Sequence, residues 1–292
     1  MNRHMKILVT GATGNTGSML IPKLINADRD VRILVRDTEK GESFRNMGAE
    51  VVTGDLDVEE SIVPAVKDID KIYLLTWNGP TQLQQVENVL NAVKKAGGRP
   101  HIIRHSMWGP ESRIIKQGLE AEELIKSSGL PWTILKPTFY MQNLMMAAGT
   151  ISSDGVIYWD MGKGKLGMID VRDIAEAAFS ALTKEGLEGK SYILTGPQAI
   201  SFDDIASIFS EKLGKEVKYI NVPGEASRQA MVGMGLPEWI ADGYVELSAG
   251  FSKNFAASTT DNVEILTGRP ARSFEQFAGD FLTVFAPGAE VA

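Results

Sequence analysis

KILVTGATGNTGSML, residues 6–20, reads as a short buried strand at 6–10, a glycine-rich turn and a helix that opens at Ser18. Gly11 permits the tight turn, Gly14 lets backbone N–H groups approach a diphosphate, and Gly17 lets the helix pack close to the sheet. The helix N-terminus then faces the phosphates. This G-x-x-G-x-x-G spacing predicts a dinucleotide-binding loop, with cofactor contacts from Gly11, Thr13, Gly14, Asn15, Thr16 and Gly17.

Composition limits the functions that the chain can have. Hydrophobic residues make up 43% of its 292 residues, charged residues make up 23%, and the net charge is −7. Without a basic run we expect no nucleic-acid or membrane partner, and without a signal or membrane-spanning pattern we expect a soluble, cytoplasmic protein. There is no cysteine, and His4, His101 and His105 lack a helical metal-ligand spacing, so we expect no metal site.

Strands and helices alternate through the first half of the chain. Strand patterns at 31–35, 50–52, 71–75, 101–105 and 132–135 are separated by helix patterns at 40–47, 61–66, 81–96 and 114–127. This alternation predicts an α/β fold, a Rossmann-type doubly wound parallel sheet that binds ligands at the carboxyl ends of its strands.

Beyond Pro137 the pattern is less regular. A short strand is expected at 156–159, and Asp170, Ser201 and Ser273 resemble helix N-caps, so the acids beside them are interpreted as capping groups. We expect residues 1–150 to form the NAD(P)-binding domain, with segments in about 151–200 returning to it. Residues 201–292 should form a smaller, mainly helical C-terminal lobe for the substrate.

The choice of cofactor should depend on the end of the second strand, where an arginine attracts the 2′-phosphate of NADP and an acid favours NAD. Arg36 followed by Asp37 favours NADP(H) over NAD(H), although Asp37 leaves a ribose contact open. Asp55 and Leu56 should flank the adenine. At the ends of later strands we expect cofactor contacts from Leu75, Thr76, Ser106, Pro137 and Phe139.

Several motifs together resemble the NmrA-like branch of the atypical short-chain dehydrogenases. They are GATGNTG at 11–17, VRILVRD at 31–37, GDLD at 54–57, ILKPTFYMQN at 134–143, IDVRDIAEAA at 169–178, LTGPQAISF at 194–202 and LTGRPARSFEQF at 266–277. Within that family the chain is most similar to the NAD(P)H:quinone reductase and triphenylmethane reductase group. The resemblance implies an NADP-dependent Rossmann fold with a small C-terminal lobe.

The chain departs from the usual Ser, Tyr and Lys of short-chain dehydrogenases, in which the lysine lowers the tyrosine pKa for proton exchange. Ser106 matches the serine, but Gly118 stands at the tyrosine position and Glu122 at the lysine position. Ser106, Lys116 and Tyr140 are therefore only weak catalytic candidates, and a Tyr–Lys proton relay is not expected.

Two functions remain open. In the first, the protein is an NADPH-dependent reductase that passes hydride to a quinone-like or other conjugated small molecule. Aromatic and polar residues at strand ends would bind this acceptor, namely Trp77, Trp108, Tyr140, Asn143 and Trp159, with Met161 and Met168 as a far wall. In the second, it is an NADP(H)-binding redox sensor without catalysis, which an exposed apolar patch around 231–239 would favour. Either would act as a monomer or homodimer.

Overall fold

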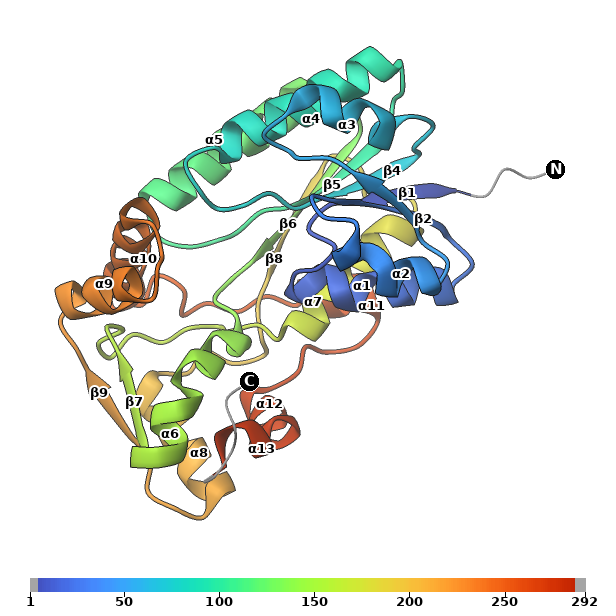
Figure 1. Cartoon of the computed structure of the whole chain (residues 1–292). Helices are drawn as coiled ribbons and strands as arrows, with labels where there is room; N and C mark the ends of the chain where they lie inside the picture. Colours follow the sequence, from blue (N-terminus) through green and yellow to red (C-terminus); the bar gives the residue numbers. More distant parts are fainter. Residues whose placement is uncertain (1–4, 287–292) are drawn as a thin grey trace. The chain divides into compact units, whose positions relative to one another are not determined.

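The computed structural model describes residues 5–286, in which seven strands form the main sheet (Figure 1). In spatial order they are β3 (Glu50–Thr53), β2 (Asp30–Val35), β1 (Lys6–Val9), β4 (Lys71–Leu74), β5 (His101–His105), β6 (Trp132–Pro137) and β8 (Lys190–Leu194). The pairs from β3 to β6 are parallel, with Val9 opposite Ile33 in β2 and Tyr73 in β4. The order reverses beside β1, which is where ligands bind in sheets of this kind. The Rossmann-type prediction is confirmed.

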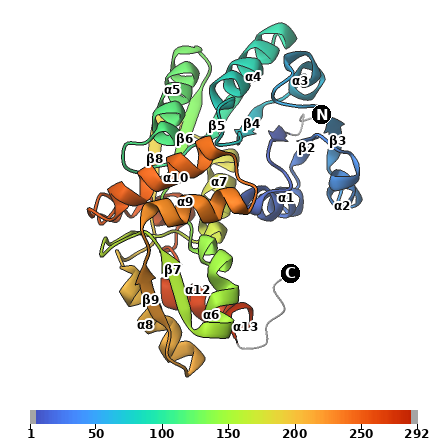
Figure 2. The same ribbon diagram turned by 60° about the vertical axis from the view of Figure 1, so that its left-hand side comes forward.

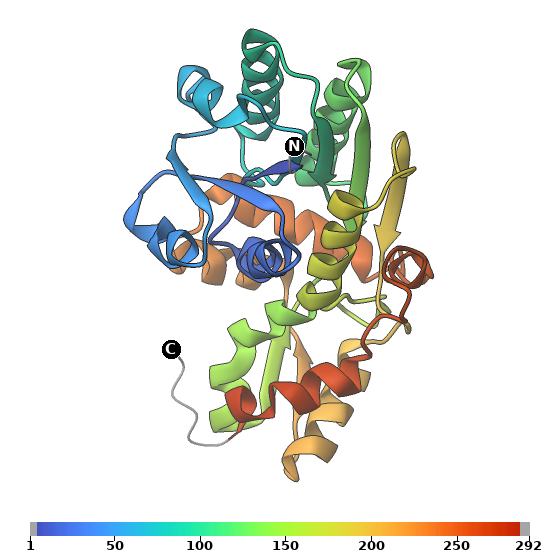
Figure 3. The same ribbon diagram turned by 90° about the vertical axis from the view of Figure 1, so that its right-hand side faces the viewer.

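Helices cover both faces of this sheet (Figures 1 and 3). They are α1 (Asn15–Asn26), η1 (Glu39–Gly41), α2 (Glu42–Asn46), α3 (Glu59–Val66), α4 (Gln82–Ala96), α5 (Arg113–Ser127) and α7 (Val171–Thr183). Apolar side chains of α3, α4 and α5 pack on Leu8, Ile72 and Leu74 to form one hydrophobic core. Burying such side chains is the main favourable contribution to folding.

The chain divides into two compact units. Of the described residues, unit 1 comprises 5–107, 116–136 and 174–193, and unit 2 comprises 108–115, 137–173 and 194–286. The segment 137–173 therefore belongs with the C-terminal residues in the second unit, although the sequence analysis placed it in the first domain or in a return to that domain. What each unit contributes to function stays a prediction.

Unit 2 is mainly helical, with a small sheet of β7 (Val156–Trp159) and β9 (Lys218–Asn221). Helices α9 and α10 lie side by side (Figure 2). The helices are η2 (Met141–Ala147), α6 (Ala148–Asp154), α8 (Phe202–Leu213), α9 (Gly224–Gly233), α10 (Glu238–Phe251), α11 (Asn262–Thr267), α12 (Phe274–Asp280) and α13 (Leu282–Phe285). No helix within residues 5–286 has the length and apolar character needed to cross a bilayer.

Three local predictions can be compared with these elements. Helix α1 begins at Asn15 rather than Ser18, because Gly14 is its N-cap and the glycine turn runs directly into the helix. The C-terminal region is mainly helical, as predicted, and strands β8 and β9 were not predicted. Ser201 and Ser273 each form a capping box, and Asp170 accepts a hydrogen bond from the Arg172 N–H, so the capping interpretation is confirmed.

Candidate functional site

A pocket of about 630 Å³ lies in unit 1 at the carboxyl ends of β1 to β4. Its walls are the loop after β1, the ends of β2, β3 and β4, and one side chain of α4. The predicted cofactor residues in its lining are Gly11, Thr13, Gly14, Arg36, Asp55, Leu56, Leu75 and Thr76, and Trp77 lines it too. Residues between positions 11 and 77 of the chain are thus brought to one cavity, because parallel strands end at the same edge of the sheet.

The glycine loop leaves no room for a side chain at Gly11 or at Gly17. Gly11 has a φ of +65°, and a Cβ on it would lie 2.8 Å from Cδ2 of Leu75. A Cβ on Gly17 would lie 2.3 Å from the carbonyl oxygen of Gly11 and 2.8 Å from that of Ala12. Backbone is therefore in direct contact with backbone here, and the N-terminus of α1 is held against the turn.

The N-terminus of α1 suits an anion. Helix α1 starts at the rim of the pocket, beside Thr13 and Gly14. No side chain caps this N-terminus, and its first turn contains no acidic residue. The first N–H groups of a helix have no intrahelical partner and carry a partial positive charge. A diphosphate at this end of α1 would accept hydrogen bonds from these N–H groups and would be attracted by their partial positive charge.

Two cations stand at the end of β2. Arg36 and Lys40 are exposed and line the pocket, and neither forms an ion pair among the residues described, 5–286. The neighbouring acid, Asp37, uses Oδ1 to accept a hydrogen bond from the N–H of Glu39 at 3.0 Å. The edge of the pocket beside β2 therefore carries two cations that are not ion-paired with any residue in 5–286, although Asp37 also lines the pocket there.

Among the lining residues that were not predicted from the sequence, Lys40, Asp57 and Gln85 carry charged or amide side chains. Gln85 lies on the buried face of α4 together with Gln82 and Asn88, among valines. Amides at helical spacing on an otherwise apolar face were the signal that could have identified Gln85. Six of the predicted cofactor residues are not in the lining: Asn15, which is exposed, Thr16 and Gly17, which are buried, and Ser106, Pro137 and Phe139, which are described below.

Ser106 follows β5, and its hydroxyl has a partner within unit 1. Its Oγ donates a hydrogen bond to Oε1 of Glu122 at 2.6 Å, and Oε2 of Glu122 accepts one from Nζ of Lys136 at 2.8 Å. The Glu122 side chain is 1% exposed, and its buried charge is compensated by these two donors and by Nζ of Lys126 at 3.8 Å from Oε2. The sequence identified Glu122 at the usual lysine position, but not its partner Lys136 on β6.

The position of the usual tyrosine carries no functional group. Gly118 is buried, and a Cβ on it would lie about 4 Å from Oγ of Ser106. Lys116, two residues earlier in the chain, is exposed on α5. Nearby His105 accepts or donates a hydrogen bond with Tyr73 through Nδ1, and burial, assisted by the Arg104 guanidinium, lowers its pKa to about 3. A neutral, buried imidazole is a poor proton source at neutral pH.

Most of the other predicted residues lie in unit 2, where they form aromatic clusters. The Phe139 ring centroid is 5.7 Å from that of Trp159 and 6.3 Å from that of Phe202, while Trp108 packs on Phe255 at 5.1 Å. Such pairs stabilise a core by themselves. Met161 and Met168 are almost fully buried, so the structure places them in the core of unit 2 and not in an accessible wall.

Tyr140 and Asn143 lie at the start of η2, where the Asn143 N–H donates to the carbonyl oxygen of Tyr140 at 3.1 Å. Burial, with a smaller contribution from Tyr244, raises the pKa of Tyr140, so its phenol keeps its proton at neutral pH. Pro137 ends β6, and its carbonyl oxygen accepts from the Trp108 N–H. The substrate and cofactor roles of these residues stay predictions.

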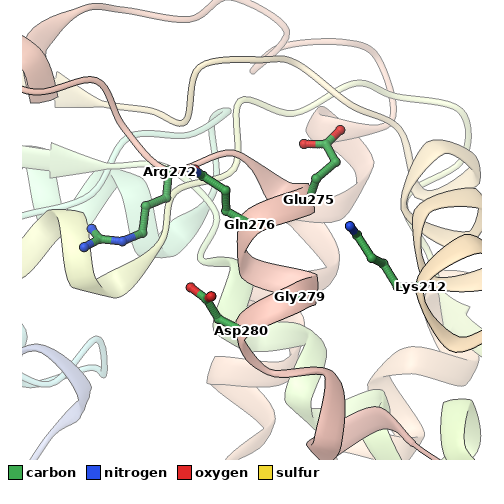
Figure 4. A pocket seen from close by; sticks show the side chains of 6 residues that line it. All are labelled: Lys212, Arg272, Glu275, Gln276, Gly279 and Asp280. Atoms are coloured by element: carbon green, nitrogen blue, oxygen red, sulfur yellow. The ribbon is translucent and has the colours of Figure 1, made fainter.

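A second, smaller pocket lies beside α12 in unit 2 (Figure 4). It is lined by Lys212, Arg272, Glu275, Gln276, Gly279 and Asp280. Three of its polar side chains are already used within the fold: Arg272 pairs with Asp173, Gln276 completes the capping box of Ser273, and Asp280 pairs with Arg172. These interactions account for Arg272, Gln276 and Asp280 without a ligand.

The described residues contain no group of three or more His, Cys, Asp or Glu side chains arranged to hold a metal ion. Of the three histidines, His101 and His105 are within this part of the chain, and His4 lies outside it.

Comparison with known proteins matches the model of the NmrA-like family to residues 3–265. An NAD(P)H azoreductase of Xenophilus azovorans is 37% identical over 93% of this chain and 96% of its own length. The crystal structure of an NADPH-dependent quinone oxidoreductase of Escherichia coli, complexed with NADPH, superposes with a TM-score of 0.85 at 25% identity, covering 94% of this chain and 99% of the other. The triphenylmethane reductase of Citrobacter sp., complexed with NADP(H), gives a TM-score of 0.80 at 27% identity over 94% and 99% of the two chains.

Proposed function

The chain belongs to the NmrA-like family, and we propose that it takes hydride from NADPH, in preference to NADH, and passes it to a quinone-like or other conjugated acceptor. Like the relatives described above, it is an NAD(P)H-dependent oxidoreductase. The observation that carries the proposal is the pocket at the switch point of the sheet, where the uncapped N-terminus of α1 lies in one cavity with Arg36 and Lys40. NADPH would supply the hydride from its nicotinamide ring.

The preference for NADPH is supported by the charges at the end of β2. Arg36 and Lys40 are free to bind a 2′-phosphate, and arginine matches phosphate geometry with paired N–H donors. In an NAD site an acid after β2 would accept hydrogen bonds from the ribose. Here the Asp37 carboxylate already accepts one from the N–H of Glu39, so it is held toward its own turn.

The acceptor class is supported by the relatives, whose names specify azo compounds, quinones and triphenylmethane dyes. Each is an extended conjugated system. Hydride addition to such a molecule spreads the new charge over many atoms or neutralises a cation, so water can provide any proton that is needed. An enzyme for these acceptors has only to hold them against the nicotinamide. The cytoplasmic location and the monomeric or homodimeric state stay predictions.

The same reaction needs no proton from Ser106. Its hydroxyl proton points to the Glu122 carboxylate, and Lys136 completes a buried set of charges around that carboxylate. We infer that Ser106 stabilises the end of β5 and does not protonate the acceptor.

Ser106→Ala is therefore expected to lower kcat less than about tenfold, while reducing the free energy of unfolding by roughly 1–3 kcal/mol because Glu122 loses a donor. Steady-state kinetics and urea unfolding measure the two effects. Lys94→Ala, an exposed change on α4 away from the site, is the control and should alter neither. A drop in kcat of more than roughly a hundredfold is the scale of general acid catalysis and would assign Ser106 a proton-transfer role.

The proposed function is tested by NADPH oxidation, followed by the absorbance of the reduced nicotinamide, against a panel of acceptors. The panel holds a benzoquinone, a naphthoquinone, an azo dye, a cationic triphenylmethane dye, an enone and a cyclic imine, each also run with NADH. We expect turnover with at least one of the quinones or dyes, and faster with NADPH. Tight NADPH binding without turnover of any acceptor would contradict the reductase and support the redox sensor.

A further inference from the structure

Trp77 follows β4 and keeps 51% of its surface exposed while it lines the nucleotide pocket. The sequence suggested that it binds the acceptor. In the structure, however, it shares the pocket lining with Asp55, Leu56 and Asp57, which follow β3 on the far side of β1 and β2. Exposed apolar surface often marks a binding site. The half-exposed indole at this pocket therefore suggests a contact with the ligand.

Gln85 of α4 fixes the backbone of Trp77. Its Oε1 accepts a hydrogen bond from the Trp77 N–H at 3.2 Å, and its Nε2 donates to Oδ1 of Asp57 at 2.9 Å. Gln85 is only 5% exposed, so the amide is held rigidly inside unit 1. One side chain thus ties the loop after β4 to the loop after β3, and Trp77 stays beside the β3 end of the pocket.

Gly79 fixes the ring of Trp77. A Cβ on Gly79 would lie 2.1 Å from Cζ3, 2.2 Å from Cε3 and 2.5 Å from Cη2 of the indole. The six-membered ring is therefore packed directly against the Gly79 backbone, and any side chain at position 79 would displace it. Two residues hold Trp77, one by its backbone and one by its ring, although much of its surface is open to solvent.

We propose that Trp77 is a cofactor-binding residue whose indole covers the adenine base, and that Gln85 and Gly79 are positioning residues for it. The inference rests on the proposed function, since Arg36 and Lys40 place the adenosine 2′-phosphate at the same end of the pocket. A purine has a flat π face, and stacking a base on an aromatic ring changes affinity by roughly five- to a hundredfold. Leu56 and the Trp77 ring offer apolar surface for such a base, and Asp57 offers an acceptor for its amino group.

Trp77 could bind either the adenine or the acceptor, and 2′,5′-ADP distinguishes these two roles. This ligand carries the adenine and the 2′-phosphate but no nicotinamide. Calorimetric titration of Trp77→Ala should show 2′,5′-ADP and NADPH weakened by the same factor, about tenfold or more, with a smaller loss in Trp77→Phe. Gly79→Ala should weaken both ligands through displacement of the indole. Gly98→Ala is its matched control, because a Cβ there meets nothing nearer than 3.7 Å, and it should bind normally.

Gln85→Leu tests the positioning role, and we expect a higher KM for NADPH with kcat retained. Unchanged 2′,5′-ADP affinity in Trp77→Ala, with a raised KM for the acceptor, would overturn the inference and return Trp77 to the acceptor site while leaving the proposed function intact. Failure of the unmodified protein to bind either 2′,5′-ADP or NADPH would overturn both proposals.

Discussion

Arg36→Glu is expected to weaken NADPH binding by roughly a hundredfold or more and NADH binding by less than about tenfold. The change removes charge-assisted hydrogen bonds to the 2′-phosphate, each of which contributes about 1.5–3 kcal/mol, and places a carboxylate beside a dianion. Because Arg36 is exposed and has no ion pair in residues 5–286, its replacement leaves no buried partner behind. Fluorescence titration of both reduced cofactors measures the difference directly.

Lys94→Glu provides the control for this reversal of charge. Lys94 is exposed near the end of α4 and does not line the pocket, so its replacement changes the net charge equally without touching the proposed phosphate site. We expect both cofactors to bind Lys94→Glu as they bind the unmodified protein. If Arg36→Glu weakened NADPH and NADH to the same extent, the assignment of the 2′-phosphate to Arg36 would be wrong.

Much of the main sheet is predictable because its strands are short apolar runs between glycine turns and amphipathic helices. The runs at 31–35, 71–75 and 101–105 coincide with β2, β4 and β5 within one residue. Strand β9 was missed because KYIN at 218–221 has only four residues and pairs with β7, far away in the sequence. A pairing partner of that kind cannot be read from local periodicity.

Some residues of the site, like some strands of the sheet, are predictable from the sequence, and others are not. The glycine loop and Arg36 have fixed spacing along one strand–turn–helix segment, so the sequence predicts them. Gln85 and the Lys136–Glu122 pair depend on how helices α4 and α5 are seated on the sheet, and this seating follows from packing between distant segments. Arg104 illustrates the limit most clearly: it reads as an ordinary charged residue, yet it is fully buried with Nη1 donating to the carbonyl oxygen of Leu74.

The glycine loop carries the second large prediction, in which Gly17→Ala abolishes measurable NADPH binding or weakens it by at least about a hundredfold. The added methyl group would lie 2.3 Å from the backbone oxygen of Gly11, so α1 and the turn must separate. The turn cannot yield easily, because Gly11 has a positive φ and already lies against Leu75. Separation would move the N–H groups of α1 away from the diphosphate that they are proposed to hold.

Thermal unfolding followed by circular dichroism distinguishes a displaced loop from a failure to fold. We expect Gly17→Ala to remain folded with a lower Tm, since the crowding of two backbone segments destabilises by a few kcal/mol. Gly98→Ala adds the same methyl group to unit 1 in open space and should retain both Tm and NADPH affinity. NADPH binding by folded Gly17→Ala at the affinity of the unmodified protein would show that the close contact between α1 and the turn is not required, and the diphosphate would then have to be held by other groups of the pocket.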